Sequence, residues 1–63
     1  MRKNLKEMRI KKDYTQHELA KKVGIERSFY TNIELGTKNP SLQVAMRIKQ
    51  VLDYFNDDIF FNL

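Results

Sequence analysis

Two short helical patterns lie next to each other in the middle of the chain, and only three residues separate them. Leu19, Ala20 and Val23 recur at the spacing of one buried helix face, and Gly24 then offers the left-handed conformation that commonly ends a helix. The next pattern begins at Arg27 and ends before a second glycine. This pair of closely joined helices constrains the fold more than any other part of the chain.

The sequence also indicates where the first of these helices begins and which side of the second is buried. Thr15 and Glu18 have the spacing of a capping box, in which each side chain accepts a hydrogen bond from the other residue's backbone N–H, so one helix begins at residue 16. In the following helix, 27–35, Tyr30 and Ile33 lie three residues apart on one face. Polar side chains occupy the opposite face, which is therefore expected to meet solvent or a ligand.

Three further short helices are predicted before and after this pair. Residues 2–12 form a basic amphipathic helix, Ser41 caps another helix, and a last short helix begins at Asn56. The apolar residues available to face a core in these helices are Leu5, Met8, Leu42, Ala45, Ile48, Leu52, Ile59, Phe60 and Leu63. No segment alternates as a strand does, so the predicted fold class is all-α: one domain over 1–63, a compact bundle of four to five short helices.

Positive charge is concentrated in the first part of the chain. The 12 lysine and arginine residues exceed the 8 acidic residues, for a net charge of +4. Residues 1–38 hold ten basic and five acidic side chains, a net charge of +5, whereas residues 39–63 have a net charge of −1. A field of this sign favours a polyanionic partner and places it near the first 38 residues.

Several kinds of site are excluded or disfavoured. The absence of cysteine excludes disulfides, thiolate zinc sites and a cysteine nucleophile, and the lone histidine, His17, has no suitably spaced second ligand, so we expect no metal and no cofactor. We find no nucleophile–base pairing, paired carboxylates or phosphate loop, so we do not expect an enzyme. No ligand domain is visible, so we expect no small-molecule effector. No apolar run has the length of a signal peptide core or membrane span, which predicts a cytoplasmic protein without a membrane partner.

Residues 16–35 have the dimensions of a DNA-binding helix-turn-helix: a helix, a three-residue glycine turn and a second helix with a polar outward face. The surrounding sequence is YTQHELAKKVGIERSFYTNIELGTKNPSLQVAMRIKQVL, which resembles the phage-repressor and Cro type of helix-turn-helix regulators, also called the xenobiotic-response-element family. The similarity covers nearly the whole chain. It implies a lambda-repressor-like DNA-binding domain whose recognition helix, 27–35, enters the major groove.

The resemblance also implies particular DNA contacts. Arg27 can grip a guanine through two hydrogen bonds and Asn32 an adenine, each worth about 1–3 kcal/mol of discrimination. Gln16 matches a glutamine that binds a phosphate and braces the recognition helix. The base-contact candidates are Arg27, Ser28, Thr31 and Asn32, and the DNA-backbone candidates are Gln16, His17, Phe29, Lys38 and Asn39. The alternative interpretation is a polar helix face that is merely solvated.

Some positions carry an architectural role or depart from the family pattern. Arg9 and Glu34 match a pair that joins the first helix to the end of the recognition helix, where loss of one buried partner costs about 3–5 kcal/mol. Glu26 stands where serine or threonine usually caps the recognition helix, and glutamate is a weaker cap. Tyr30 replaces a smaller aliphatic residue, so the packing behind the recognition helix must differ.

Aromatic residues gather in the segment 53–63 and have two interpretations. Such clusters are more often core, but a chain of 63 residues cannot bury all of them, and exposed apolar patches tend to mark partner sites. The dimer-interface candidates are Tyr54, Phe55, Phe60, Phe61 and Leu63. A two-fold dimer would read half-sites about 34 Å apart on an inverted repeat.

Two functions from different classes fit these features. The first is a sequence-specific transcriptional regulator, a nucleoid-associated bacterial repressor that binds double-stranded DNA as a homodimer and excludes polymerase from an operator. The second is an antitoxin-like or partner-controlled interaction module, in which the C-terminal aromatic residues hold a regulatory protein and DNA binding is secondary.

Overall fold

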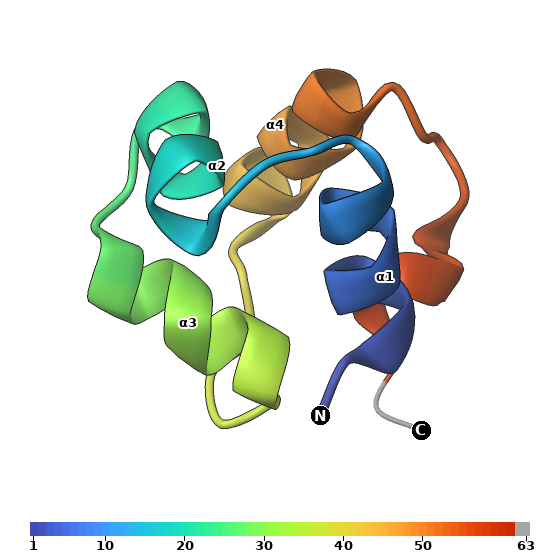
Figure 1. The fold of residues 1–63 in the computed structure, drawn as a ribbon. Helices are drawn as coiled ribbons and strands as arrows, with labels where there is room; N and C mark the ends of the chain where they lie inside the picture. Colours follow the sequence, from blue (N-terminus) through green and yellow to red (C-terminus); the bar gives the residue numbers. More distant parts are fainter. Residues whose placement is uncertain (62–63) are drawn as a thin grey trace.

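The structure is a computed structural model that describes residues 1–61, and this part of the chain forms four α-helices and one short 3-10 helix, with no strand among them (Figure 1). In chain order these are α1 (Lys3–Lys11), α2 (Gln16–Val23), α3 (Arg27–Leu35), α4 (Leu42–Leu52) and η1 (Asp57–Phe60). The predicted all-α class is confirmed.

The ends of α2 and α3 follow from local sequence chemistry. The capping box is present: Glu18 N donates to Thr15 Oγ1 at 3.0 Å, and Thr15 N donates to Glu18 Oε1 at 2.8 Å. The hydrogen bonds with Thr15 hold the pKa of the Glu18 carboxyl below its ordinary value. Gly24 and Gly36 end α2 and α3 with φ of 86° and 87°, in the left-handed region that side chains disfavour.

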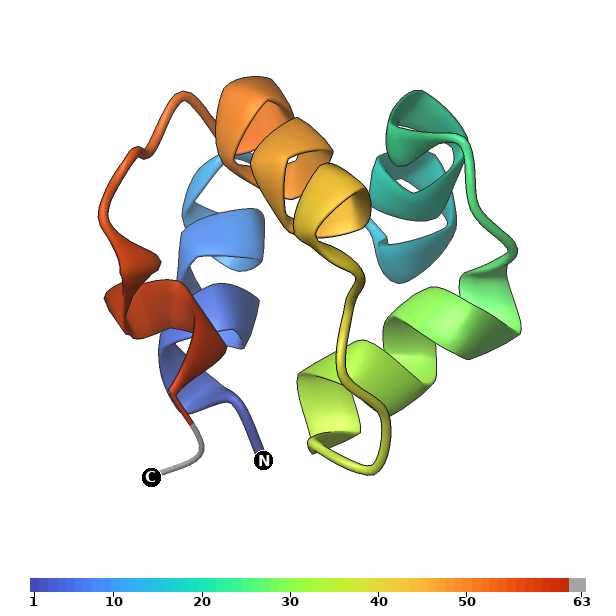
Figure 2. The ribbon, with the colours of Figure 1, turned by 180° about the vertical axis from the view of Figure 1, so that it is seen from behind.

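The core is built from one apolar stripe on each element. α2 packs against α3 and α4, and α1 packs against α3 and η1. Figures 1 and 2 show α4 lying between α1 and α2. The fully buried apolar residues are Leu5, Leu19, Ala20, Val23, Tyr30, Ile33, Ile48, Leu52 and Ile59. Because α3 contributes only one side to this core, its other side is left at the surface.

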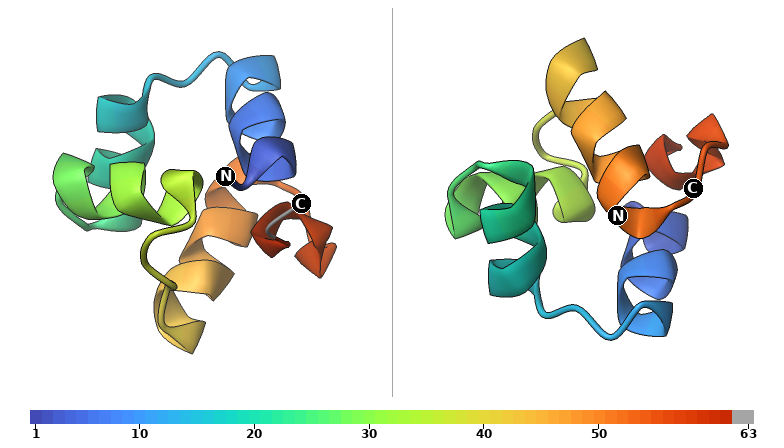
Figure 3. Two further views of the ribbon diagram at one scale, coloured as in Figure 1. Left: turned by 90° about the horizontal axis from the view of Figure 1, so that it is seen from below. Right: turned by 90° about the horizontal axis from the view of Figure 1, so that it is seen from above.

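One prediction about the second half of the chain was wrong. Leu42, expected to be buried, is 80% exposed, because the first turn of α4 extends beyond the neighbouring helices (Figure 3). The short last helix predicted to begin at Asn56 is a 3-10 helix of four residues, and the Asn56 side chain caps it by accepting from Asp58 N at 3.2 Å. Leu63, expected to pack there, lies outside the described residues.

Among residues 1–61, none of the helices combines the length and apolar character needed to cross a bilayer. No cluster of three or more His, Cys, Asp or Glu residues in the same range is arranged to hold a metal ion.

Candidate nucleic-acid interface

The four base-contact candidates all lie on α3, on the side that does not enter the core. Arg27 and Ser28 are exposed in its first turn, and Thr31 and Asn32 are half-buried one turn later. The Asn32 side-chain oxygen accepts a hydrogen bond from the Thr37 hydroxyl at 3.0 Å. The first turn of α3 is thus the most accessible part of this polar face.

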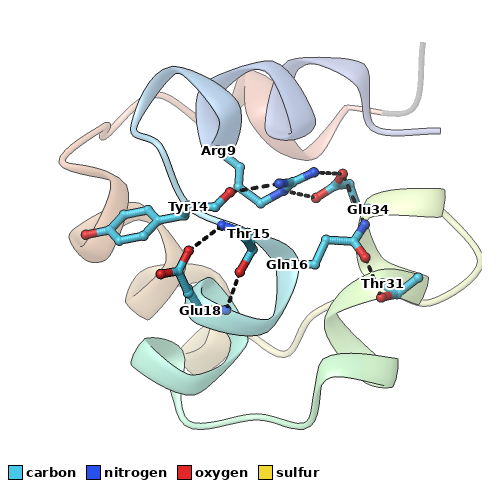
Figure 4. Close-up of polar contacts among 7 residues, drawn as sticks. All are labelled: Arg9, Tyr14, Thr15, Gln16, Glu18, Thr31 and Glu34. Atoms are coloured by element: carbon cyan, nitrogen blue, oxygen red, sulfur yellow. Dashed lines mark hydrogen bonds and ion pairs between the residues drawn. The ribbon is translucent and has the colours of Figure 1, made fainter.

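A chain of side-chain hydrogen bonds holds α3 against α1 and α2 (Figure 4). Arg9 donates to Glu34 through two nitrogens, Nε to Oε2 and Nη2 to Oε1, each at 3.0 Å. Gln16 Nε2 donates to Glu34 Oε1 at 3.4 Å, and Thr31 Oγ1 donates to Gln16 Oε1 at 2.9 Å. The structure therefore brings together residues from α1, the start of α2 and the middle and end of α3.

The Arg9–Glu34 ion pair is buried, with exposed fractions of 8% for Arg9 and 2% for Glu34. Burial by itself raises the pKa of the Glu34 carboxyl, but the hydrogen bonds and charge of Arg9 outweigh it, so the pKa lies below the ordinary value. Arg9 Nη1 also donates to the backbone oxygen of Tyr14 at 2.8 Å. A bidentate arginine–carboxylate pair of this kind fixes the orientation of α1 relative to α3 and also balances the two buried charges.

The Tyr30 ring fills the space behind α3 and is completely buried. Burial and the neighbouring Glu34 carboxylate hold the pKa of the Tyr30 phenol above its ordinary value. Its hydroxyl has no hydrogen-bond partner with suitable geometry in the described part of the chain. Tyr30, the large residue for which we expected a different packing behind the recognition helix, is therefore completely enclosed by the core.

The DNA-backbone candidates fall into two groups. His17, Lys38 and Asn39 are exposed, whereas Gln16 and Phe29 are half-buried. Phe29 packs against the core, so only part of its ring is accessible. A shallow hollow between α2 and the start of α3 is lined by His17, Ala20, Lys21, Ile25, Glu26 and Arg27.

The start of α3 lacks a side-chain cap, which agrees with the departure at Glu26. Glu26 has extended backbone angles at the cap position, and its side chain makes no capping hydrogen bond. The carboxylate is exposed. A negative charge at this end of α3 would repel a phosphate group placed near it.

Arg2 is a residue that the sequence patterns did not single out. Only 3% of it is exposed, and its guanidinium donates to four acceptors in the end of α3, the following loop and η1. Three of these acceptors are backbone carbonyls, at Ile33, Lys38 and Phe60. No sequence motif could have identified Arg2, because every residue type has a backbone carbonyl and the sequence does not show which carbonyls Arg2 binds.

The aromatic dimer-interface candidates separate by exposure. Phe55 and Phe61 are 69% and 55% exposed, whereas Tyr54 and Phe60 are half-buried against the core. The Tyr54 hydroxyl donates to Asp58 Oδ1 at 2.9 Å. Phe55 lines a small surface hollow together with Met46, Lys49 and Gln50. The accessible apolar surface therefore includes part of α4, which the sequence patterns did not indicate.

The tight turn between α2 and α3, with the polar side of α3 turned outward, can be compared with known proteins. A family model described as helix-turn-helix matches residues 5–54, which include α1 to α4. The chain belongs to the helix-turn-helix family. It is of the xenobiotic-response-element type, as its sequence pattern predicted.

Relatives of this helix-turn-helix protein are named as transcriptional regulators. The uncharacterized HTH-type transcriptional regulator YqaF of Bacillus subtilis is 48% identical over 61 residues, which cover 97% of the chain and 79% of YqaF. An uncharacterized HTH-type transcriptional regulator of Archaeoglobus fulgidus is 45% identical over 60 residues, covering 95% of the chain and 84% of that protein. SinR of Bacillus subtilis is 38% identical over 50 residues, but these cover only 45% of SinR. No solved structure matches.

The family and these relatives support DNA-binding transcription regulation for the helix-turn-helix chain. Double-stranded DNA is the partner that the family implies.

Proposed function

We propose that this helix-turn-helix protein binds a specific DNA sequence through α3 and represses transcription by occupying an operator. The observation that carries the proposal is the exposed first turn of α3, on a helix whose middle and end are held by polar contacts to α1 and α2. Arg27 and Ser28 are accessible there, while Arg9 and Glu34 anchor the opposite end of the helix. A rigid helix with free polar side chains near its N-terminus matches the geometry of major-groove reading.

Phosphate contacts would come from residues on either side of α3. Lys38 and Asn39 lie in the loop after α3, and Gln16 and His17 lie at the start of α2. Gln16 uses its side-chain oxygen for Thr31 and one amide N–H for Glu34, so its second amide N–H is the group left to donate to phosphate. The net charge of +5 in residues 1–38 adds a sequence-independent attraction that weakens as salt rises.

A dimer is favoured by the size of one protomer. The Cα atoms extend 25 Å along the longest axis, whereas half-sites read from one face of DNA lie about 34 Å apart. One chain offers one recognition helix, so an inverted repeat needs two copies related by a two-fold axis. The exposed side chains of Phe55 and Phe61 supply apolar surface for such an interface.

A second candidate function uses the same apolar surface for another protein. In this case a regulatory partner covers Phe55 and the neighbouring hollow on α4, and its binding controls DNA occupancy. The exposed Met46 beside Phe55 supports this alternative, because methionine surfaces adapt to varied partners.

Selection of bound duplexes from a random pool, followed by affinity measurement at physiological salt, tests the proposal. The selected duplex should bind at least about 1,000-fold more tightly than unrelated DNA. Equal affinity for selected and unrelated duplexes would reject sequence-specific regulation. Sedimentation of the complex should show two protein copies on each selected duplex, and one copy would reject the dimer.

A further inference from the structure

Arg2 binds the C-terminal end of the recognition helix, although it lies 31 residues before Ile33 in the sequence. Its backbone N–H donates to Glu34 O at 2.7 Å, and its Nη1 donates to Ile33 O at 2.6 Å. Carbonyls in the last turn of a helix have no partner further along that helix. Arg2 therefore bonds two of them, although Ile33 O also accepts from Gly36 N at 3.1 Å, and it places a positive charge at the negative end of the α3 dipole.

The same guanidinium also holds the loop that follows α3. Nη1 donates to Lys38 O at 2.9 Å, and Nη2 donates to Asn39 Oδ1 at 2.6 Å. These are the two loop residues placed on the phosphate side in the proposed complex. Arg2 thus connects the end of the reading helix directly to the groups that would grip the DNA backbone.

A fourth guanidinium hydrogen bond connects Arg2 to η1. Its Nε donates to Phe60 O at 2.9 Å. Four of the five guanidinium N–H groups are therefore used inside the protein, and the residue is 3% exposed. Little of Arg2 remains for a direct phosphate contact. Lysine carries the same charge on a single nitrogen and cannot reproduce this planar set of donors.

We propose that Arg2 is a positioning residue for DNA binding. It sets the place of Lys38 and Asn39 relative to α3, and thereby strengthens binding to every sequence without touching DNA. This inference rests on the proposed function, because it assigns Lys38 and Asn39 to the DNA backbone. Phosphate contacts determine register and affinity but carry no base information, so Arg2 affects affinity and leaves sequence preference unchanged.

The test compares Arg2→Lys with the matched control Lys3→Arg, which exchanges the same two residue types at an exposed neighbouring position. Both variants keep the net charge. Affinity is measured on a selected and an unrelated duplex at one salt concentration. Arg2→Lys should weaken binding to both duplexes by about tenfold, with their ratio unchanged within about twofold, whereas Lys3→Arg should bind as wild type does.

A double-mutant cycle separates positioning from general destabilisation. In a background carrying Lys38→Ala and Asn39→Ala, Arg2→Lys should change affinity by less than about twofold, because the groups that it positions are gone. An unchanged tenfold loss in that background, or no loss in the wild-type background, would overturn the proposal. A wild-type protein without preference for the selected duplex would instead reject the proposed function.

The folded fraction of each variant is measured by far-UV circular dichroism under the binding conditions. If Arg2→Lys is partly unfolded, all proteins are compared in enough sucrose to restore full folding, since excluded osmolytes favour the compact state. The tenfold difference should persist between fully folded proteins. Its disappearance there would show that Arg2 acts on stability alone and would overturn the proposal.

Discussion

The Thr31 hydroxyl donates a hydrogen bond to the side-chain oxygen of Gln16 at 2.9 Å, joining the middle of α3 to the first residue of α2. Gln16 in turn donates to the buried Glu34 carboxylate at 3.4 Å. Thr31 lies among the base-contact candidates, but in the free protein its hydroxyl proton is used within the protein. We infer that Thr31 holds the angle between the two helices of the motif as well as facing the groove.

Removing this hydroxyl should weaken the link between α2 and α3. Thr31→Val keeps the side-chain shape but leaves the Gln16 oxygen without its partner, and should lower the free energy of unfolding by about 0.5–1.5 kcal/mol. Urea denaturation measures the change. Ser28→Ala removes an exposed hydroxyl from the same helix and should change stability by less than about 0.5 kcal/mol. Equal effects of the two substitutions would contradict the bracing role.

The buried ion pair should be the most sensitive polar contact in the domain. Arg9→Met leaves the Glu34 carboxylate buried without its partner and should lower the free energy of unfolding by about 3–5 kcal/mol. Lys49→Met is the control, because it breaks the exposed pair with Asp57, whose loss should cost less than about 1 kcal/mol. Similar losses in the two variants, measured by urea denaturation, would argue against a structural role for the buried pair.

Acid should destabilise the domain through Glu34. Its pKa is lowered in the folded state, so its contribution to stability is present above the ordinary value of 4.5 and is lost as pH falls through the folded-state pKa. Denaturation curves collected between about pH 7 and pH 3 should show this loss below the ordinary glutamate pKa. Glu34→Gln should flatten that part of the profile, and an unchanged slope would contradict the assignment.

Self-association should depend on Phe55. Phe55→Ser removes a ring that is 69% exposed, so it should reduce dimer formation on DNA while leaving the fold intact. Ile10→Ser is the control, because Ile10 is also 54% exposed but lies on α1, which carries none of the interface or DNA-contact candidates. Sedimentation with and without the selected duplex gives the masses. A wild-type protein that stays monomeric in both conditions, or a Phe55→Ser variant that dimerises fully, would exclude this surface as the interface.

Predictions from sequence succeeded where the deciding contact is local. Thr15 and Glu18 cap α2 across three residues, and Gly24 ends it. Both ends of α2 are therefore determined by residues that are close together in the sequence. Leu42 was wrongly expected to be buried because its helical spacing does not show whether another helix covers that turn. Arg2 was missed because its acceptors lie 31 to 58 residues away along the chain. Only the tertiary arrangement brings them together.

The most direct test of α3 as the reading element compares the base preferences of Arg27→Ala and Lys38→Ala with those of the wild type. Duplexes that differ at single positions are titrated at one salt concentration. Arg27→Ala should relax the preference at one position of each half-site, by about 1–3 kcal/mol. Lys38→Ala should weaken all duplexes alike and reduce the salt slope by about one unit. A uniform loss in Arg27→Ala, with every base preference retained, would contradict recognition through the first turn of α3.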